Sequence, residues 1–274
     1  MADQKLEIYK DAETVAQAAA QRTLLAILDG VNECQGAGDA GAKPIRSRYD
    51  VALTGGSDIL RALTYMASNP LVDAIDWSRV HFWWSDDRFV AATDEDRSSW
   101  QARQRFLNKL VADGRLPESN IHEMAVDSRA PEQVAAATDA ENDELLAKAA
   151  ADYEAELKRE LSDEPTMDLL ILGMGPDGHF ASLFPGHDEI NITDPARLAV
   201  GVTHSPKMPP LRISMTAPML ARSRRTWMLT CGAGKAKATA AVFARPNNPA
   251  YPASFATGAE EFTWFTTPDA VSEL

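Results

Sequence analysis

An aspartate and a histidine two positions apart, Asp177 and His179, are the residues of this sequence best suited to acid–base chemistry. Histidine exchanges a proton near neutral pH, and a nearby carboxylate can orient its ring or stabilise its charged form. Both residues follow an apolar run at 169–172 that ends in Gly173 and Gly175. We predict that this run is a buried strand, and in open α/β sheets ligands bind at the carboxyl ends of strands.

A structural interpretation of the same stretch is equally consistent with its residues. In that interpretation the glycines serve a tight turn, Asp177 caps a following helix and His179 lies on the surface. The stretch alone does not decide between the two, so the rest of the chain must be considered.

Composition excludes several classes of protein. The 274 residues are 45% hydrophobic and 24% charged, which is typical of a globular protein. No apolar run has the length of a membrane span, and the N-terminus lacks the apolar region of a signal peptide. Cys34 and Cys231 lie in unrelated contexts and are expected to be free thiols, so we expect a cytoplasmic location. The net charge of -13 argues against nucleic-acid and anionic-membrane partners.

The hydrophobic pattern predicts an α/β domain in which strands alternate with helices. Apolar runs predict strands at 49–54, 80–84, 169–172, 198–202, 211–216, 226–231 and 262–265. Helical spacing predicts helices at 11–29, 59–66, 99–112, 131–161 and 236–243, the first of them ended by Gly30. We therefore predict a doubly wound, mostly parallel sheet with helices on both faces in a single domain, 1–274, with a mobile surface loop at 31–48.

Four of the predicted strand ends carry polar, glycine-rich segments, at 54–57, 85–88, 173–179 and 231–235. The first contains Gly55, Gly56 and Ser57 before a helix, an arrangement that can bind an anion through backbone N–H groups. Considered alone, the segment 54–57 is better explained as an ordinary turn, and the segment 85–88, which contains Arg88, as a salt-bridged turn. Because the carboxyl ends of parallel strands meet at one edge of a sheet, the four segments together favour a shared site.

Three cations accompany these segments. Arg88 and Lys235 lie at strand ends, and Arg212 shares one face of an extended segment with Ser214. Lys235 lies near a helix N-terminus, where the dipole disfavours a cation unless an anion is bound, although chance placement is common. Lysine and arginine suit phosphate or carboxylate groups. With Asp177 and His179, these residues predict acid–base chemistry on a small phosphorylated metabolite.

The sequence resembles the 6-phosphogluconolactonase family over about residues 49–265. The resemblance is carried by the motifs GMGPDGHFASLFPG, VALTGGS, WWSDDRFV, SPKMPPLRIS and CGAGKAKA. It implies a doubly wound fold shared with glucosamine-6-phosphate deaminase and ribose-5-phosphate isomerase. It also implies hydrolysis of 6-phosphoglucono-δ-lactone to 6-phosphogluconate in the pentose phosphate pathway, without a required metal or cofactor. The expected partner is therefore the phosphosugar lactone, bound by a monomer or weak dimer.

The resemblance also implies roles for the site residues. His179 would be the general base for an attacking water, and Asp177 would hold and charge its ring. Phosphate binding or oxyanion stabilisation would fall to the remaining site residues, whose individual tasks the sequence does not assign: Gly55, Gly56, Ser57, Arg88, Arg212 and Lys235. The chain departs from the usual family pattern at Asp58, Asp87, Ser98 and Thr267.

Two other functions remain to be distinguished. An amino-sugar-phosphate deaminase or isomerase of the same fold would resemble this chain at Asp86, Asp177 and His179. Such enzymes place a glutamate five residues after the histidine, where this chain has Phe184. A sugar-phosphate sensor would need a DNA-binding segment, and the acidic predicted helix before residue 31 does not supply one.

Overall fold

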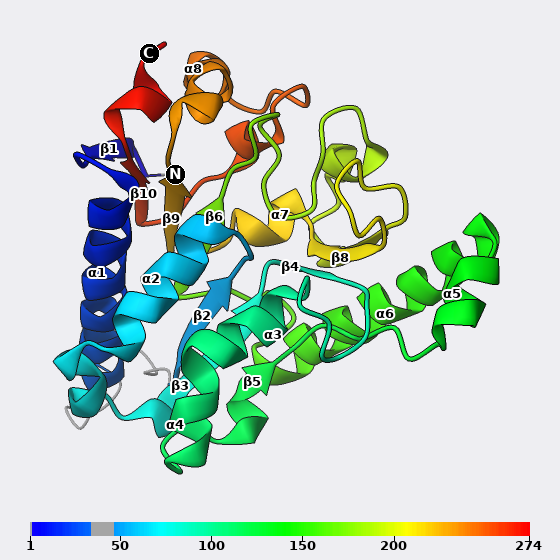
Figure 1. The fold of residues 1–274 in the computed structure, drawn as a ribbon, viewed down its shortest axis with the longest axis horizontal. Coiled ribbons are helices and arrows are strands. Elements are labelled where there is room, and N and C mark those ends of the chain that lie inside the picture. The colour runs from blue at the N-terminus through cyan, green and yellow to red at the C-terminus, as the bar shows by residue number, and fades with distance from the viewer. Residues whose placement is uncertain (1, 34–46) are drawn as a thin grey trace.

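The computed structural model describes residues 2–33 and 47–274, organised around a seven-stranded sheet (Figure 1). Every strand pair in this sheet is parallel. In spatial order the strands are β1 (Gln4–Ile8), β10 (Glu261–Thr266), β9 (Arg225–Thr230), β6 (Leu169–Gly173), β2 (Tyr49–Leu53), β3 (Val80–Trp84) and β5 (Ile121–His122). The central strands are short apolar runs buried on both faces, which confirms the prediction of a mostly parallel α/β sheet.

A second, three-stranded sheet was not predicted. It contains β4 (Asp86–Arg88), β8 (Arg212–Met215) and β7 (Ala199–Val202), in that order, and both of its pairings are antiparallel. The predicted strands at 198–202 and 211–216 therefore exist but lie outside the main sheet. Residues 86–88, predicted as part of a strand end, form the third strand, so β4 carries the chain from one sheet into the other.

Helices surround the parallel sheet, as expected for a doubly wound fold (Figure 1). Two of them, α1 and α2, pack side by side, whereas α6 packs on β7 and β8. The helices are α1 (Ala12–Glu33), α2 (Ser57–Ala67), α3 (Ser98–Ala102), α4 (Asn108–Ala112), α5 (Pro131–Ala136), α6 (Asp139–Glu160), α7 (Ala217–Leu220) and α8 (Ala236–Ala244). None of the helices among the described residues combines the length and apolar character needed to traverse a bilayer.

Two predicted helix boundaries were wrong. The helix predicted at 131–161 is interrupted after α5, because the Thr138 side chain and Glu141 form a capping box that starts α6. The first helix does not stop at Gly30 but continues to Glu33. A Cβ on Gly30 would lie 2.2 Å from ring atoms of Tyr49, so this glycine permits close packing and does not end the helix.

Part of the predicted surface loop at 31–48 belongs to this longer helix, since α1 includes residues 31–33. Residues 34–46, with Cys34, lie outside the described residues, so the prediction of a mobile loop stays a prediction. The strand β1 was not predicted, because its mostly polar residues resemble an exposed tail. β1 forms an edge strand through its parallel pairing with β10.

The β3–β5 edge of the main sheet contains a histidine pair. Nδ1 of His81 lies 2.9 Å from Nε2 of His122, whose ring stacks on Trp83 with centroids 3.8 Å apart. Burial, the positive charge of Arg48 and the neighbouring His122 lower the pKa of His81 to about 4. His81 is thus in the sheet with a neutral ring at pH 7.

The four strand ends singled out in the sequence meet in space. They follow β9, β6, β2 and β3, which are consecutive neighbours in the sheet. The prediction that these segments share one edge is therefore confirmed. The segments therefore lie side by side, and one of them, 85–88, contains strand β4 of the antiparallel sheet.

Candidate active site

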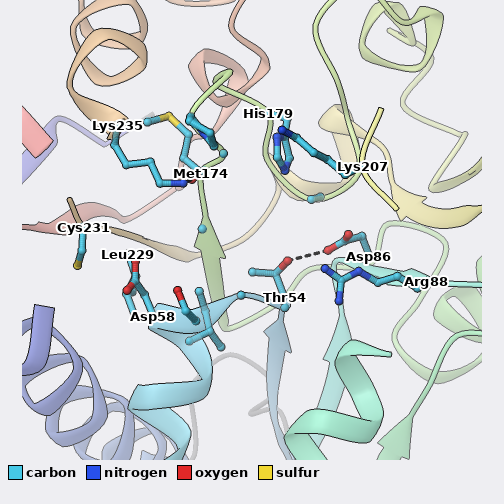
Figure 2. Close-up of a pocket in the computed structure, with 18 of the residues that line it drawn as sticks. Thr54, Asp58, Asp86, Arg88, Met174, His179, Lys207, Leu229, Cys231 and Lys235 are labelled. Carbon is cyan, nitrogen blue, oxygen red and sulfur yellow. Dashed lines mark hydrogen bonds between the residues drawn. The ribbon is translucent and has the colours of Figure 1, made fainter. Parts of the chain in front are cut away.

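A cavity of about 440 Å³ opens at this edge of the sheet (Figure 2). The predicted site residues that line it are Gly55, Gly56, Ser57, Arg88, His179, Arg212 and Lys235. Asp177 lies beside the cavity and contacts the ring of His179. The walls also contain polar side chains that were not predicted as site residues: Thr54, Asp58, Asp86, Lys207 and Cys231.

Asp177 and His179 form a close hydrogen-bonded pair. Oδ1 of Asp177 lies 2.5 Å from Nδ1 of His179. Burial raises the pKa of Asp177, but the hydrogen bond and charge of His179 outweigh it and lower that pKa to about 2. The carboxylate is therefore ionised at neutral pH and can only accept, so Nδ1 of His179 carries the proton. Nε2 is left as the nitrogen that can accept a proton from a ligand or water.

Gly175 makes room for this pair. A Cβ at this position would lie 2.1 Å from Nδ1 and Cε1 of His179 and 2.5 Å from Oδ1 of Asp177. The Gly175 N–H also donates to the carbonyl of His179, at 2.9 Å, and Gly178 turns the chain with a φ of 80°. No helix follows Asp177 in this described segment, so the interpretation of Asp177 as a helix cap is wrong.

The turn between β2 and α2 presents the start of a helix to the cavity. Helix α2 begins at Ser57, and Gly56 precedes it with a φ of 116° that favours glycine. A Cβ on Gly55 would lie 2.4 Å from Oγ of Ser98 and 3.4 Å from Nη1 of Arg88. The buried atoms Ser98 Oγ and Arg88 Nε have no hydrogen-bond partner among the described residues. Unpaired donors beside a helix N-terminus favour a bound anion.

Arg88 and Arg212 occupy directly opposite positions on β4 and β8, and both line the cavity. Like charges at opposite positions of an antiparallel pair destabilise it. An anion between the two guanidinium groups would remove this repulsion. The register of the small sheet therefore concentrates positive charge on one wall of a protein whose net charge is -13.

Arg212 is also bound to the chain itself. Its guanidinium donates to three consecutive carbonyls, those of Lys207 (3.0 Å), Met208 (3.2 Å) and Pro209 (2.9 Å). The side chain is buried and lies 5.9 Å from the centroid of the Phe184 ring. Burial lowers the pKa of Arg212 to about 10, which leaves the group charged at neutral pH.

Lys235 lies at the N-cap of α8, which confirms its predicted place near a helix N-terminus. Its Nζ donates to the carbonyl of Met174, in the loop that continues to His179. Burial lowers the pKa of Lys235, and the negative charges of Asp58 and Asp177 partly oppose that shift. Lys235 thus faces the cavity from the side opposite Arg88 (Figure 2).

Asp86 connects three walls of the cavity. Its Oδ1 accepts a hydrogen bond from Thr54 at the end of β2, and its Oδ2 accepts one from Ser182 in the loop after His179, both at 2.6 Å. Asp86 is buried, and Ser85 donates to it at 3.3 Å. Both oxygens are thus engaged by hydroxyl groups of the protein. The motif SDDR indicated charge at this strand end, but its partners come from distant segments.

The structure shows what surrounds the residues at which the chain departs from the family pattern. Asp58 lines the cavity near Lys235 and Cys231, and burial raises its pKa. The same burial, with the charge of Asp58, raises the pKa of Cys231 to about 12, so the thiol is protonated at neutral pH. Thr267 accepts a hydrogen bond from the N–H of Gly232 at 3.0 Å and so ties the end of β10 to the turn before Lys235.

Asp87 holds the start of α3, because its carboxylate accepts hydrogen bonds from the N–H groups of Ser98 (2.7 Å) and Ser99 (3.1 Å). Ser98 is thereby fixed beside Gly55. In the part of the chain that the structure describes, no group of three or more His, Cys, Asp or Glu side chains is placed to hold a metal ion.

Comparison with known proteins identifies the family of this chain. Residues 10–264 match the family described as glucosamine-6-phosphate isomerases/6-phosphogluconolactonase. The chain belongs to this family. Curated relatives include the 6-phosphogluconolactonase of Streptomyces coelicolor, 35% identical over 98% of this chain and 94% of that protein. The 6-phosphogluconolactonase of Mycobacterium tuberculosis is 34% identical over 98% of both chains.

Solved structures with low sequence identity have the same fold. The 6-phosphogluconolactonase of Trypanosoma brucei matches with a TM-score of 0.80 and 21% identity, over 99% of each chain. A monomeric glucosamine-6-phosphate deaminase matches with a TM-score of 0.69 and 16% identity, over 98% of this chain and all of that one. The fold is therefore shared by proteins named for two different chemistries, and the residues of the cavity must distinguish them.

Proposed function

We propose that this protein hydrolyses 6-phosphoglucono-δ-lactone to 6-phosphogluconate, the second step of the oxidative pentose phosphate pathway. The observation that carries the proposal is the Asp177–His179 pair, whose free imidazole nitrogen lies in a cavity lined by cations and a helix N-terminus. Relatives at 34% and 35% identity along almost the whole chain bear the name of this activity.

In this mechanism Nε2 of His179 removes a proton from a water molecule as its oxygen attacks the lactone carbonyl. The carbonyl π electrons move onto oxygen and form a tetrahedral oxyanion. When the oxyanion collapses, the bond between the carbonyl carbon and the ring oxygen breaks, and the imidazolium returns its proton to that ring oxygen. Asp177 stabilises the intermediate imidazolium through the 2.5 Å hydrogen bond. The carboxylic acid product then loses its proton to solvent.

The substrate phosphate is assigned to the turn at Gly55, Gly56 and Ser57 together with Arg88. The support is the pair of unpartnered buried atoms beside this turn, Ser98 Oγ and Arg88 Nε, and the start of α2. Lys235 and Arg212 add positive charge on the neighbouring walls.

The test is turnover of freshly generated lactone, with 6-phosphogluconate measured through a coupled dehydrogenase. The lactone opens spontaneously, so rates are taken above a baseline without protein. We expect the wild type to exceed the baseline and His179→Gln to lose about 100-fold or more. A wild-type rate equal to the baseline would reject the lactonase function, and a fully active His179→Gln would remove His179 from the mechanism.

An amino-sugar-phosphate deaminase or isomerase is the alternative on this fold. Its glutamate would stand at Phe184, whose ring is buried and lies 4.7 Å from the ring of His179, centroid to centroid. The position next to the histidine is thus filled by an apolar ring where that chemistry needs a carboxylate. Turnover of glucosamine 6-phosphate, measured as ammonia release, should be absent.

A further inference from the structure

Residues 205–210, with the sequence SPKMPP, form a loop between β7 and β8 that borders the cavity. Lys207 and Met208 of this loop line the cavity. Three prolines, Pro206, Pro209 and Pro210, restrict its backbone. Ser205 restrains it further, since its hydroxyl accepts from the Lys207 N–H (3.1 Å) and donates to the Lys207 carbonyl (2.8 Å).

Arg212 anchors the loop from the other side. Its Nε and Nη2 donate to the three carbonyls of residues 207–209 at 2.9–3.2 Å. The guanidinium is buried beneath the loop and packs on Phe184. Most of its N–H groups therefore donate to the protein itself, as expected of a side chain that fixes the backbone of Lys207.

The side chain of Lys207 is exposed, in contrast to the buried side chain of Arg212. It is 46% exposed, and its Nζ lies 3.8 Å from Oδ2 of Asp177, the oxygen on the far side of the carboxylate from His179. A loose ion pair of this kind holds a lysine weakly. Figure 2 shows Lys207 beside His179, away from Arg88 and Asp58. The ammonium group is therefore on the side of the cavity where His179 would activate water.

We propose that Lys207 is a catalytic residue that stabilises the oxyanion on the lactone carbonyl, and that Arg212 is a positioning residue that holds the Lys207 loop. This inference rests on the proposed lactonase function and divides the cations by task. Arg88 and the turn at 55–57 bind the phosphate at one end of the substrate, whereas Lys207 acts at the carbonyl end. The flexible side chain of Lys207 would interact more strongly with the negatively charged oxygen of the transition state than with the neutral carbonyl of the bound lactone.

The first test compares Lys207→Met with Lys237→Met, in which an exposed lysine of α8 outside the cavity loses the same charge. We expect Lys207→Met to lower kcat about 10- to 100-fold with little change in KM. Lys237→Met should retain wild-type kinetics. Unfolding temperatures of both variants, measured by circular dichroism, should match the wild type because both side chains are exposed.

Competitive inhibition separates the carbonyl end from the phosphate end. The product 6-phosphogluconate carries a carboxylate at the position of the former carbonyl, whereas glucose 6-phosphate carries only the phosphate. Lys207→Met should weaken inhibition by 6-phosphogluconate about tenfold and leave inhibition by glucose 6-phosphate unchanged. Equal weakening of both inhibitors would place Lys207 at the phosphate and overturn the assignment.

A double-mutant cycle tests the role of Arg212. Arg212→Lys keeps the charge but cannot span three carbonyls, so its loss of kcat should be non-additive with that of Lys207→Met. Additive losses would mean that Arg212 acts on substrate independently of Lys207. If the wild type fails to exceed the spontaneous rate, the lactonase function itself is rejected. If the wild type is active and Lys207→Met is equally active, only the present inference is rejected.

Discussion

Replacement of Gly175 by alanine should separate activity from stability. The new Cβ would lie 2.1 Å from two ring atoms of His179, whereas ordinary contacts begin near 3.4 Å. The ring must therefore move by roughly 1 Å, a displacement that can cost about 100-fold in rate when it affects the reacting group. In activation free energy this is about 2.7 kcal/mol. The φ of Gly175 is not in the left-handed region, so alanine adds no backbone strain there.

The cost to folding should be small. The side chain of His179 is 20% exposed and borders the cavity, so the ring can yield without moving the sheet. Alanine also restricts the unfolded chain, which stabilises a protein by about 0.4–1 kcal/mol where the backbone permits it. We therefore expect the free energy of unfolding to change by no more than about 1 kcal/mol.

The assay is lactone turnover above the spontaneous rate, paired with urea unfolding of the same preparations. Gly234→Ala is the matched control, because Gly234 lies next to the cavity residue Lys235, has no left-handed φ, and its Cβ would meet no atom within 4 Å. The reasoning is refuted if Gly175→Ala retains at least a third of the wild-type turnover, or if Gly234→Ala loses as much.

Three further predictions concern the supporting structure. The folded chain binds a proton at His81 only near pH 4, whereas the unfolded chain binds it near pH 6.5. The contribution of this residue to the free energy of unfolding should therefore be full above pH 6.5 and be lost as the pH falls toward 4. His81→Asn should reduce the difference in free energy of unfolding between pH 7.5 and pH 5, measured with urea, by about 1 kcal/mol. Gly30→Ala should destabilise by about 1–3 kcal/mol through its clash with Tyr49, despite better helix propensity, and a raised melting temperature would contradict this. Thr54→Val should lower the free energy of unfolding by about 1.5–3 kcal/mol, because it removes a hydrogen-bond donor to Asp86. Thr54→Ser keeps the hydroxyl and should lower it much less. Equal unfolding midpoints for the two variants would show that the hydroxyl is unimportant.

The parallel sheet was predictable because each central strand is a short apolar run that stops at glycine or charge. The antiparallel direction and separate sheet of β7 and β8 were not predictable, since an apolar pattern such as that of β8 is the same in either sheet. β1 and β4 were missed because they are short and polar, and their strand character comes from pairing with β10 and β8. Gly30 was misread for a related reason, since the ring that excludes a Cβ from this position of α1 belongs to Tyr49 in β2.

The site was predictable to the extent that its residues follow strand ends. His179, Arg88 and Lys235 meet at one cavity because β6, β3 and β9 are neighbours or near neighbours. Asp86 and Lys207 were not assigned to it, because their roles depend on contacts between distant segments. The hydroxyl of Ser182 that engages Asp86 lies 96 positions away along the chain, a partner that no local pattern can indicate.

The pairing of β1 with β10 has a consequence for how the molecule is made. β1 precedes the other described strands along the chain, but its partner is the distant segment Glu261–Thr266. Every segment that lines the cavity, up to Lys235, precedes β10 in the chain. The residues that line the cavity are therefore all synthesised before the strand between β1 and β9. The pairing of β1 with β10 must close a long loop, so we expect it to form late in folding.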